Sequence, residues 1–251
     1  MKAKNCSIFF IFVLIAGCAG TESLTPSETM PVNTEMVQTG PLIYFNPEES
    51  DSTVQSLIES YRDSLLAFTE RKVATASSDL TFEKPAYSLG YLLADILRFR
   101  ASRELRDFVH IGITDEQSYK TYLKQGTITI GDMYQLLPYD NHLTVLSMCG
   151  KDIIALMEEI AAMGGAPVSG VRMSISDGAA KGVLVNAEVV DSSKTYLVAT
   201  NSYLANGNGP FRSLHNFKER KDLDLLVRKA FIDYFKNQQQ IEPVNDERIR
   251  E

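Results

Sequence analysis

Apolar residues recur three or four positions apart in four stretches of the chain, with polar residues between them. This spacing places the apolar side chains on one face of a helix, so each stretch predicts an amphipathic helix. The first stretch begins at Asp51, a residue type that caps helix N-termini well. The predicted helices lie at residues 51–68, 89–97, 153–160 and 223–234.

Between these helices the pattern changes to short runs rich in β-favouring residues, bounded by turns that contain glycine and aspartate. We expect strands at residues 107–113, 127–130, 143–149, 171–175, 183–190 and 195–200. Helices and strands mixed over about 190 residues predict one α/β (α+β) domain, with a mixed sheet flanked by helices. We place this domain at residues 42–237 and expect a solvated tail at 238–251.

The first residues have the pattern of an export signal. A basic start is followed by an apolar run at residues 8–15 and by Leu-Ile-Ala-Gly-Cys18, which resembles the bacterial lipobox. We expect a signal peptide at 1–17, lipidation of Cys18, and a flexible tether at 18–41, rich in Thr, Ser, Glu and Pro. The protein is then exported and lipid-anchored to a bacterial membrane, on its periplasmic or cell-surface side, without spanning it. The alternative is an ordinary signal peptide with a coincidental cysteine.

Charge and cysteine content limit which partners the protein is expected to have and which interactions stabilise its fold. The formal net charge of −7 disfavours nucleic acid, or an anionic membrane face, as the main partner. Once Cys6 is removed and Cys18 is lipidated, Cys149 is the one cysteine left, so no intramolecular disulfide is expected. The exported fold must therefore be stabilised by its apolar core.

Two loop stretches combine a tyrosine with amide side chains. In the first, Pro138 ends a short apolar segment and Tyr139-Asp140-Asn141 forms a polar corner before a strand. In the second, Tyr203 follows a strand and precedes the glycine- and asparagine-rich run 206–209. Two tyrosines on facing loops are able to sandwich a planar ring, with stacking worth about 1–3 kcal/mol per base. The alternative is that both rings only pack at the rim of the fold.

These stretches belong to an ordered series of motifs that resembles the C-terminal domain of bacterial 5′-nucleotidases, which include UDP-sugar hydrolase and 2′,3′-cyclic-nucleotide 2′-phosphodiesterase. The resemblance covers about residues 51–236. Its segments are 88–95 (SLGYLLAD), 125–132 (QGTITIGD), 137–143 (LPYDNHL), Gly150, 169–172 (SGVR) and 196–205 (YLVATNSYLA). They are similar to the family's NLGNLVADA, AGEITYGD, LPFGNTL, LTG, SGLR and YRVATNDFLA.

The resemblance implies a nucleoside site. Two aromatic residues sandwich the base in that family, an asparagine fixes it, a Gly-Gly-Asp-Gly loop holds the ribose, and a Gly-Gly-Ile-Arg segment supplies an arginine. The matching substrate-binding residues here are Tyr139, Asn141, Tyr203, Asn206, Gly207, Asn208, Gly112 and Thr114. Asn208 replaces the ribose-binding aspartate and Thr114 replaces the arginine. Neutral groups usually form weaker hydrogen bonds than charged ones, so the polar contacts to the ligand are reduced.

Catalysis in that family belongs to an N-terminal metallophosphoesterase domain with two metals, which this chain does not match. The chain has three histidines, too few for such a site. Residues 140–142 have the D-x-H pattern of such enzymes, but they lie in the aromatic corner, and we attribute this match to chance. We expect no catalytic residue, metal site or cofactor in this chain, with divalent metals only in a partner, and no hydrolysis by the chain alone.

The sequence thus predicts the nucleoside- or nucleotide-recognition half of a split 5′-nucleotidase, acting in nucleotide catabolism or salvage. A separate two-metal metallophosphoesterase chain would supply hydrolysis and contact the face around residues 51–68. The alternatives are a non-catalytic nucleoside-binding lipoprotein and a domain with only an interaction role.

Overall fold

The computed structural model describes residues 52–83 and 87–250. The expected signal peptide, Cys18 and the tether at 18–41 lie outside the described residues. In the described ranges, no helix combines the length and the apolar character that crossing a membrane requires.

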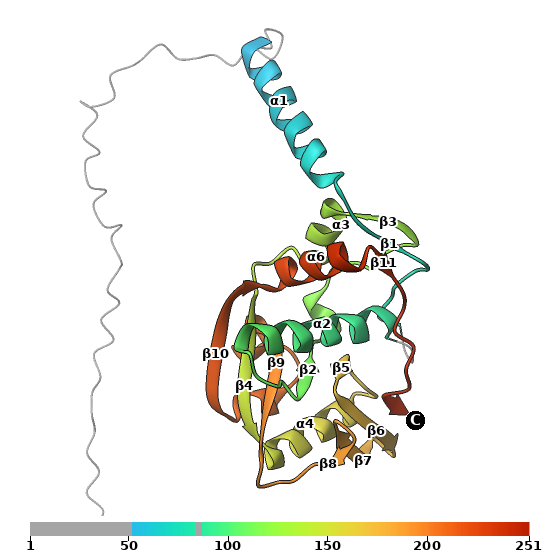
Figure 1. The fold of residues 1–251 in the computed structure, drawn as a ribbon, viewed down its shortest axis with the longest axis vertical. Coiled ribbons are helices and arrows are strands. Elements are labelled where there is room, and N and C mark those ends of the chain that lie inside the picture. The colour runs from blue at the N-terminus through green and yellow to red at the C-terminus, as the bar shows by residue number, and fades with distance from the viewer. Residues whose placement is uncertain (1–51, 84–86, 251) are drawn as a thin grey trace, which may run out of the picture. The chain divides into compact units, whose positions relative to one another are not determined.

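Helices and strands alternate along the described chain (Figure 1). The α-helices are α1 Ser52–Thr69, α2 Ser88–Leu105, α3 Ile130–Leu136, α4 Gly150–Ala162, α5 Ser202–Ala205 and α6 Val227–Gln238, and the 3-10 helices are η2 Glu116–Ser118 and η3 Arg212–His215. The strands are β1 Lys72–Ala76, β2 Ile111–Ile113, β3 Gly126–Thr129, β4 His142–Cys149, β5 Val168–Ser169, β6 Val171–Ser176, β7 Ala179–Val185, β8 Glu188–Val189, β9 Thr195–Asn201, β10 Phe217–Leu226, β11 Gln240–Ile241 and β12 Ile249–Arg250.

The strands form three sheets, and the largest has the order β10-β4-β9-β2-β5. In it β2 and β9 are parallel, whereas the β10–β4, β4–β9 and β2–β5 pairs are antiparallel. The two smaller sheets have the orders β11-β1-β3 and β12-β6-β7-β8. This mixed architecture confirms the predicted α/β fold class.

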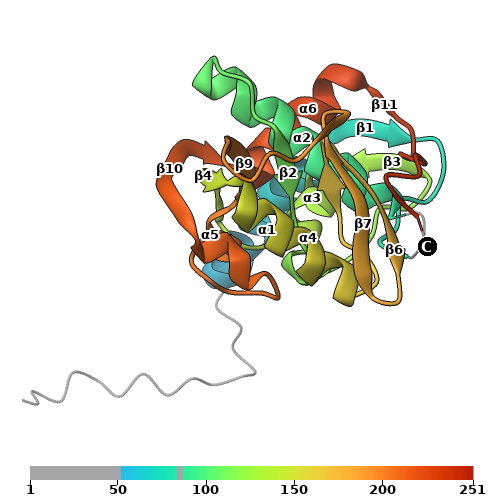
Figure 2. The same ribbon diagram turned by 90° about the horizontal axis from the view of Figure 1, so that it is seen from below.

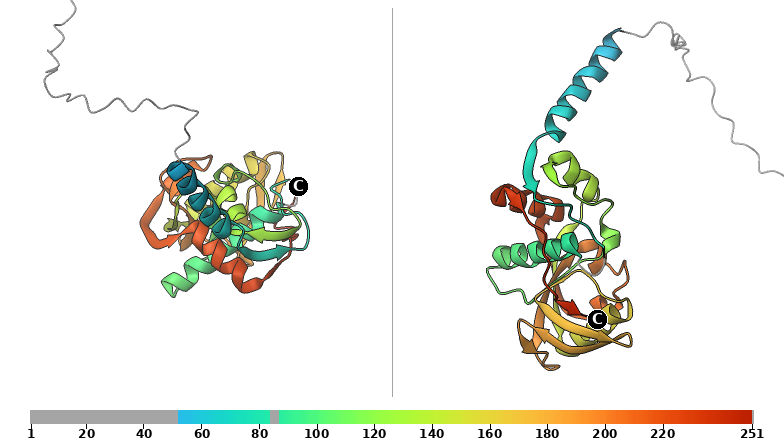
Figure 3. Two further views of the ribbon diagram at one scale, coloured as in Figure 1. Left: turned by 90° about the horizontal axis from the view of Figure 1, so that it is seen from above. Right: turned by 90° about the vertical axis from the view of Figure 1, so that its right-hand side faces the viewer.

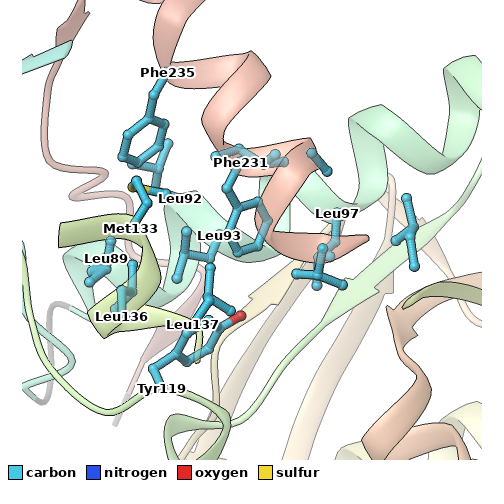
Figure 4. Packing of buried hydrophobic residues seen from close by; sticks show 14 of the residues in the cluster. Leu89, Leu92, Leu93, Leu97, Tyr119, Met133, Leu136, Leu137, Phe231 and Phe235 are labelled. Carbon is cyan, nitrogen blue, oxygen red and sulfur yellow. The ribbon is translucent and has the colours of Figure 1, made fainter. Parts of the chain in front are cut away.

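Two groups of buried apolar side chains stabilise the fold. One joins α2, α3 and α6 to the sheets, and Figure 4 shows Leu93 of α2, Met133 of α3 and Phe231 of α6 converging there. The other lies between α4 and the large sheet, around Leu156 and Val198. All five side chains are fully buried, and removing such apolar surface from water stabilises the folded state.

A capping box fixes the start of α3 and thereby the approach to the tyrosine corner. Thr129 Oγ1 accepts a hydrogen bond from the Asp132 backbone N–H at 3.2 Å, while the Asp132 carboxylate accepts one from the Thr129 N–H at 2.7 Å. The helix ends at Leu136, two residues before Pro138, as expected for a helix that a proline stops.

The prediction of a single helix over residues 223–234 was wrong at its start. Leu223 and Leu225 are buried in β10, whereas the neighbouring Asp222 and Asp224 are exposed, and α6 begins only at Val227. This alternation has the period of a strand, and β10 pairs with β4 on either side of it, at Asp222 and at Leu226.

The prediction of a solvated tail at 238–251 was also wrong. Residues 240–241 pair with β1 and residues 249–250 pair with β6. Arg248 is buried, and its charge is compensated by ion pairs with Asp95 and Asp246. Its guanidinium also lies 4.8 Å from the centroid of the Tyr91 ring. In the described residues the fold therefore continues to residue 250.

Helix α1 leaves its apolar face open to solvent. Val54, Leu57, Ile58, Tyr61 and Leu65 are 50–66% exposed. The right-hand view of Figure 3 shows α1 extending away from the other helices and sheets, with its last turns near α3. That contact includes the edge-to-face pair of Phe68 and Tyr134, whose ring centroids are 6.1 Å apart.

A pair of matched leucine substitutions tests this difference in packing. Leu93→Ala in α2 should lower the free energy of unfolding by about 2–5 kcal/mol, because it opens a cavity in the core. Leu57→Ala in α1 should change it by less than about 0.5 kcal/mol, because the side chain is exposed. Urea denaturation of both variants measures this, and equal losses would contradict an open α1 face.

Candidate functional site

The antiparallel pairing of β4 with β9 brings the two tyrosine-bearing stretches to one end of the large sheet. Leu143 near the start of β4 lies opposite Asn201 at the end of β9. The corner before β4 and helix α5 after β9 therefore become neighbours, and Figure 2 shows α5 beside the end of this sheet. The His142 N–H donates to Ser202 Oγ at 3.1 Å, and that hydroxyl donates to Asn141 Oδ1 at 3.4 Å.

Both tyrosines of this pair are open to solvent. Tyr139 is 57% exposed and Tyr203 is 38% exposed, although each follows a buried element. Lys120 Nζ lies 5.6 Å from the centroid of the Tyr139 ring, within cation–π range. Exposed aromatic rings at a rigid loop end are well suited to stack against a planar ligand.

Arg228, which the sequence analysis did not single out, fixes the corner that carries Tyr139. Its guanidinium donates to the Leu137 carbonyl oxygen at 2.7 Å and forms an ion pair with Asp140. It also lies 4.0 Å from the centroid of the Tyr134 ring. Arg228 is 8% exposed, and a buried cation requires such partners. The contact joins α6 to a corner far away in the sequence, so no local pattern pointed to it.

The predicted loop 206–209 is fixed by contacts with the protein itself. Asn206 Oδ1 accepts a hydrogen bond from Arg220 at 2.7 Å, and Asn208 Nδ2 donates to the Tyr203 carbonyl oxygen at 3.1 Å. Gly207 has a φ of +87°, and a Cβ there would lie 1.9 Å from the His215 ring. The absence of a side chain at Gly207 therefore allows the loop to pass close to His215. The hydrogen bond from Asn208 holds the loop beside Tyr203.

Gly112 and Thr114 are both buried, behind the exposed tyrosines. A Cβ at Gly112 would lie 2.3 Å from the Ala94 carbonyl oxygen, so this glycine allows α2 to pack on the sheet. Thr114 is fully buried, and its hydroxyl shares a 2.8 Å hydrogen bond with the Tyr119 hydroxyl. The structure thus brings Tyr139, Asn141, Tyr203 and the 206–209 loop together, while Gly112 and Thr114 belong to their support.

Asp115, another residue the sequence analysis missed, connects this support to α5. Ser118 Oγ donates to Asp115 Oδ1 and accepts a hydrogen bond from Asn201 Nδ2 at 3.2 Å. Asn201 Oδ1 in turn accepts the Leu204 N–H at 2.9 Å and caps α5, which carries Tyr203. Burial raises the pKa of Asp115 above its ordinary value, against the opposing effects of the Ser118 hydrogen bonds and of Lys120.

A cavity of about 270 Å³ adjoins Asp115 and the end of the 206–209 loop. Its lining includes Glu116, Gln117, Pro210 and Phe211 and contains no lysine, arginine or histidine. A larger cavity of about 710 Å³ lies among α2, β6 and the C-terminal segment and contains none of the predicted site residues.

In the described part of the chain, no group of three or more His, Cys, Asp or Glu side chains is arranged to hold a metal ion. The side chains of the D-x-H sequence at 140–142 have other partners. Asp140 is paired with Arg228, and His142 Nδ1 lies 3.2 Å from the Leu223 carbonyl oxygen.

Asp115→Asn should change the pH dependence of stability in one direction. An acid whose pKa is raised by folding binds its proton more tightly in the folded state, so its contribution to stability falls as pH rises above its ordinary pKa. The variant lacks this titration, and its melting temperature relative to the wild type should rise between about pH 4 and about pH 8. Glu116→Gln controls for the loss of a neighbouring charge, and a relative melting temperature that falls with pH would contradict the assignment.

Comparison with known proteins places this geometry in a family. The sequence profile described as 5′-nucleotidase, C-terminal domain, matches residues 67–216. Protein UshA of Salmonella pullorum is 26% identical over 145 residues, which cover 55% of this chain and 26% of that protein.

Solved structures agree with this match. The crystal structure of a 5′-nucleotidase precursor from Thermus thermophilus superposes with a TM-score of 0.65 at 26% identity, covering 80% of this chain and 43% of the other. The NAD nucleotidase of Haemophilus influenzae has the same fold, with a TM-score of 0.60 at 19% identity over 80% of this chain and 41% of its own. The chain spans less than half the length of these relatives. Because the profile covers more than half of its residues, the chain belongs to the family of 5′-nucleotidase C-terminal domains.

Proposed function

We propose that this protein is the nucleoside- or nucleotide-recognition half of a split 5′-nucleotidase. The observation that carries the proposal is the pair of exposed tyrosines, Tyr139 and Tyr203, held with Asn141 at one end of the large sheet. The rings offer two faces for a base, and the amide offers a donor and an acceptor for its edge. Membership of the 5′-nucleotidase C-terminal family supports a nucleotide-related ligand.

Hydrolysis in this proposal comes from a separate metallophosphoesterase chain that carries two divalent metals and activates water. The part that this chain covers is less than half the length of the matched relatives. Export and lipid anchoring through Cys18 remain part of the proposal, with both components on the outer side of a bacterial membrane.

The open face of α1 supports a protein partner. Val54, Leu57, Ile58, Tyr61 and Leu65, with Phe68, fall within an arc of about 100°, the width with which a helix usually packs against a protein core. The charged residues of α1 are Glu59, Arg62 and Asp63, and it has no lysine, unlike helices that bind anionic membrane surfaces. The family match begins at residue 67, in the last turn of α1, so most of this face lies outside the matched residues.

Calorimetric titration of the protein with adenosine and AMP tests ligand recognition. We expect binding in the micromolar to low-millimolar range, weakened about tenfold or more by Tyr139→Ala and again by Tyr203→Ala, because each substitution removes one stacking face. Phe108→Ala removes an exposed aromatic that lines the larger cavity and should leave binding unchanged. Binding that survives loss of both tyrosines, or is lost with Phe108→Ala, would contradict the proposed site.

Leu65→Glu tests the proposed partner surface. Each exported two-metal phosphoesterase of the source organism is mixed with the protein, and complex formation is followed by analytical ultracentrifugation together with AMP hydrolysis. We expect one of them to form a complex that Leu65→Glu weakens about tenfold or more, because a carboxylate would be buried in an apolar contact.

Ser60→Glu, on the polar face of the same helix, is the matched control and should bind as the wild type does. Absence of a complex with every phosphoesterase would favour the alternative function, a non-catalytic nucleoside-binding lipoprotein. The observation that favours this alternative is Thr114 itself, a neutral and fully buried residue at the position that matches the arginine of the resembled motif. Self-association abolished by Leu65→Glu would instead assign the face to a second copy of the chain.

A further inference from the structure

The Asp115 carboxylate has one oxygen without a partner. Asp115 is 3% exposed, and while Oδ1 accepts from Ser118, Oδ2 is buried and has no hydrogen bond within the described residues. Buried polar atoms are nearly always hydrogen-bonded, because an unpaired acceptor forfeits the interaction it had with water. An unpaired carboxylate oxygen therefore indicates a position where a donor is expected.

This oxygen lies where the elements of the tyrosine site meet. A Cβ built on Gly209 would be 3.5 Å from Asp115 Oδ2 and 4.0 Å from Tyr203 Cε1. The carboxylate and the Tyr203 ring thus flank the same glycine of the loop. Since Gly209 has no side chain, no Cβ fills the space between the Tyr203 ring and this oxygen.

The surroundings select the chemistry of that ligand. Asp115 and Glu116 both line the adjoining cavity, and no cationic side chain does. Neither Lys120, which lies against the Tyr139 ring, nor Arg220, which donates to Asn206 Oδ1, lines this cavity. A phosphate entering this cavity would meet two acids without a counter-charge, whereas a hydroxyl would donate its hydrogen to the unpaired oxygen.

We propose that Asp115 accepts a hydrogen bond from a ribose hydroxyl, and that the chain by itself prefers an uncharged nucleoside to a nucleoside phosphate. This inference rests on the proposed function, because the base is held by Tyr139 and Tyr203. Asp115 then determines specificity for the sugar, while its bonds through Ser118 and Asn201 keep α5 in place. The phosphate of a nucleotide points away from this chain, towards the partner.

A double-mutant cycle with hydroxyl-deficient ligand tests the contact. Adenosine and 2′,3′-dideoxyadenosine are titrated into the wild type and into Asp115→Asn by calorimetry. In the wild type, removing the hydroxyls should weaken binding about tenfold or more, because the buried carboxylate loses its donor. In Asp115→Asn this loss should shrink to less than about threefold, since the charged acceptor is absent.

Glu116→Gln is the matched control, because it removes a charge from the adjacent position and should keep the full loss. If removing the ribose hydroxyls weakens binding equally in the wild type and in Asp115→Asn, the proposal is overturned. The same holds if only Glu116→Gln abolishes this loss of affinity. Adenosine binding to the wild type that is insensitive to both tyrosine substitutions would instead contradict the proposed function itself.

A second measurement needs no variant. Titration of the wild type with AMP and adenosine should give adenosine an affinity about fivefold or more higher, because the acids repel the phosphate. Tighter binding of AMP would overturn the preference for an uncharged ligand.

Discussion

The antiparallel pairing of β4 with β9 is the interaction on which the site depends. It sets the start of one strand beside the end of the other, so that two loops about sixty residues apart become neighbours. Both faces of these strands are buried, with Leu143 and Val145 in one apolar group and Leu146 and Val198 in the other. A slip of one residue would exchange the two sets of side chains, so packing on both faces favours this register. The position of Tyr139 relative to Tyr203 follows from this register and from the hydrogen bonds between Ser202 and the corner.

Local patterns were sufficient for much of the fold. Helices α2 and α4 and strands β4 and β9 have clear periodicity, and Pro138 ends α3 where expected. The charged strand β10 was missed because a short run of alternating Asp and Leu before a helix also fits a helical spacing. The final segment was missed because its burial comes from Arg248, whose partner Asp95 lies on α2. Such contacts leave no local signal.

The residues of the candidate site were likewise predicted only in part. Motif resemblance pointed to Tyr139, Asn141, Tyr203 and the 206–209 loop, and the structure brings these residues together. It also pointed to Thr114, whose hydroxyl turns to Tyr119 inside the core. Arg228 and Asp115 act through distant partners, so their roles became apparent only in three dimensions. The candidate site therefore combines the two exposed tyrosine rings with the buried Asp115, which lies beside the 206–209 loop.

The measurement that tests the central claim most directly is a crystal structure of the protein with adenosine. The account predicts the base between the Tyr139 and Tyr203 rings, with Asn141 at its edge. A base bound elsewhere, for example in the larger cavity between α2 and β6, would contradict it, as would crystals soaked at saturating adenosine with no ligand beside either tyrosine.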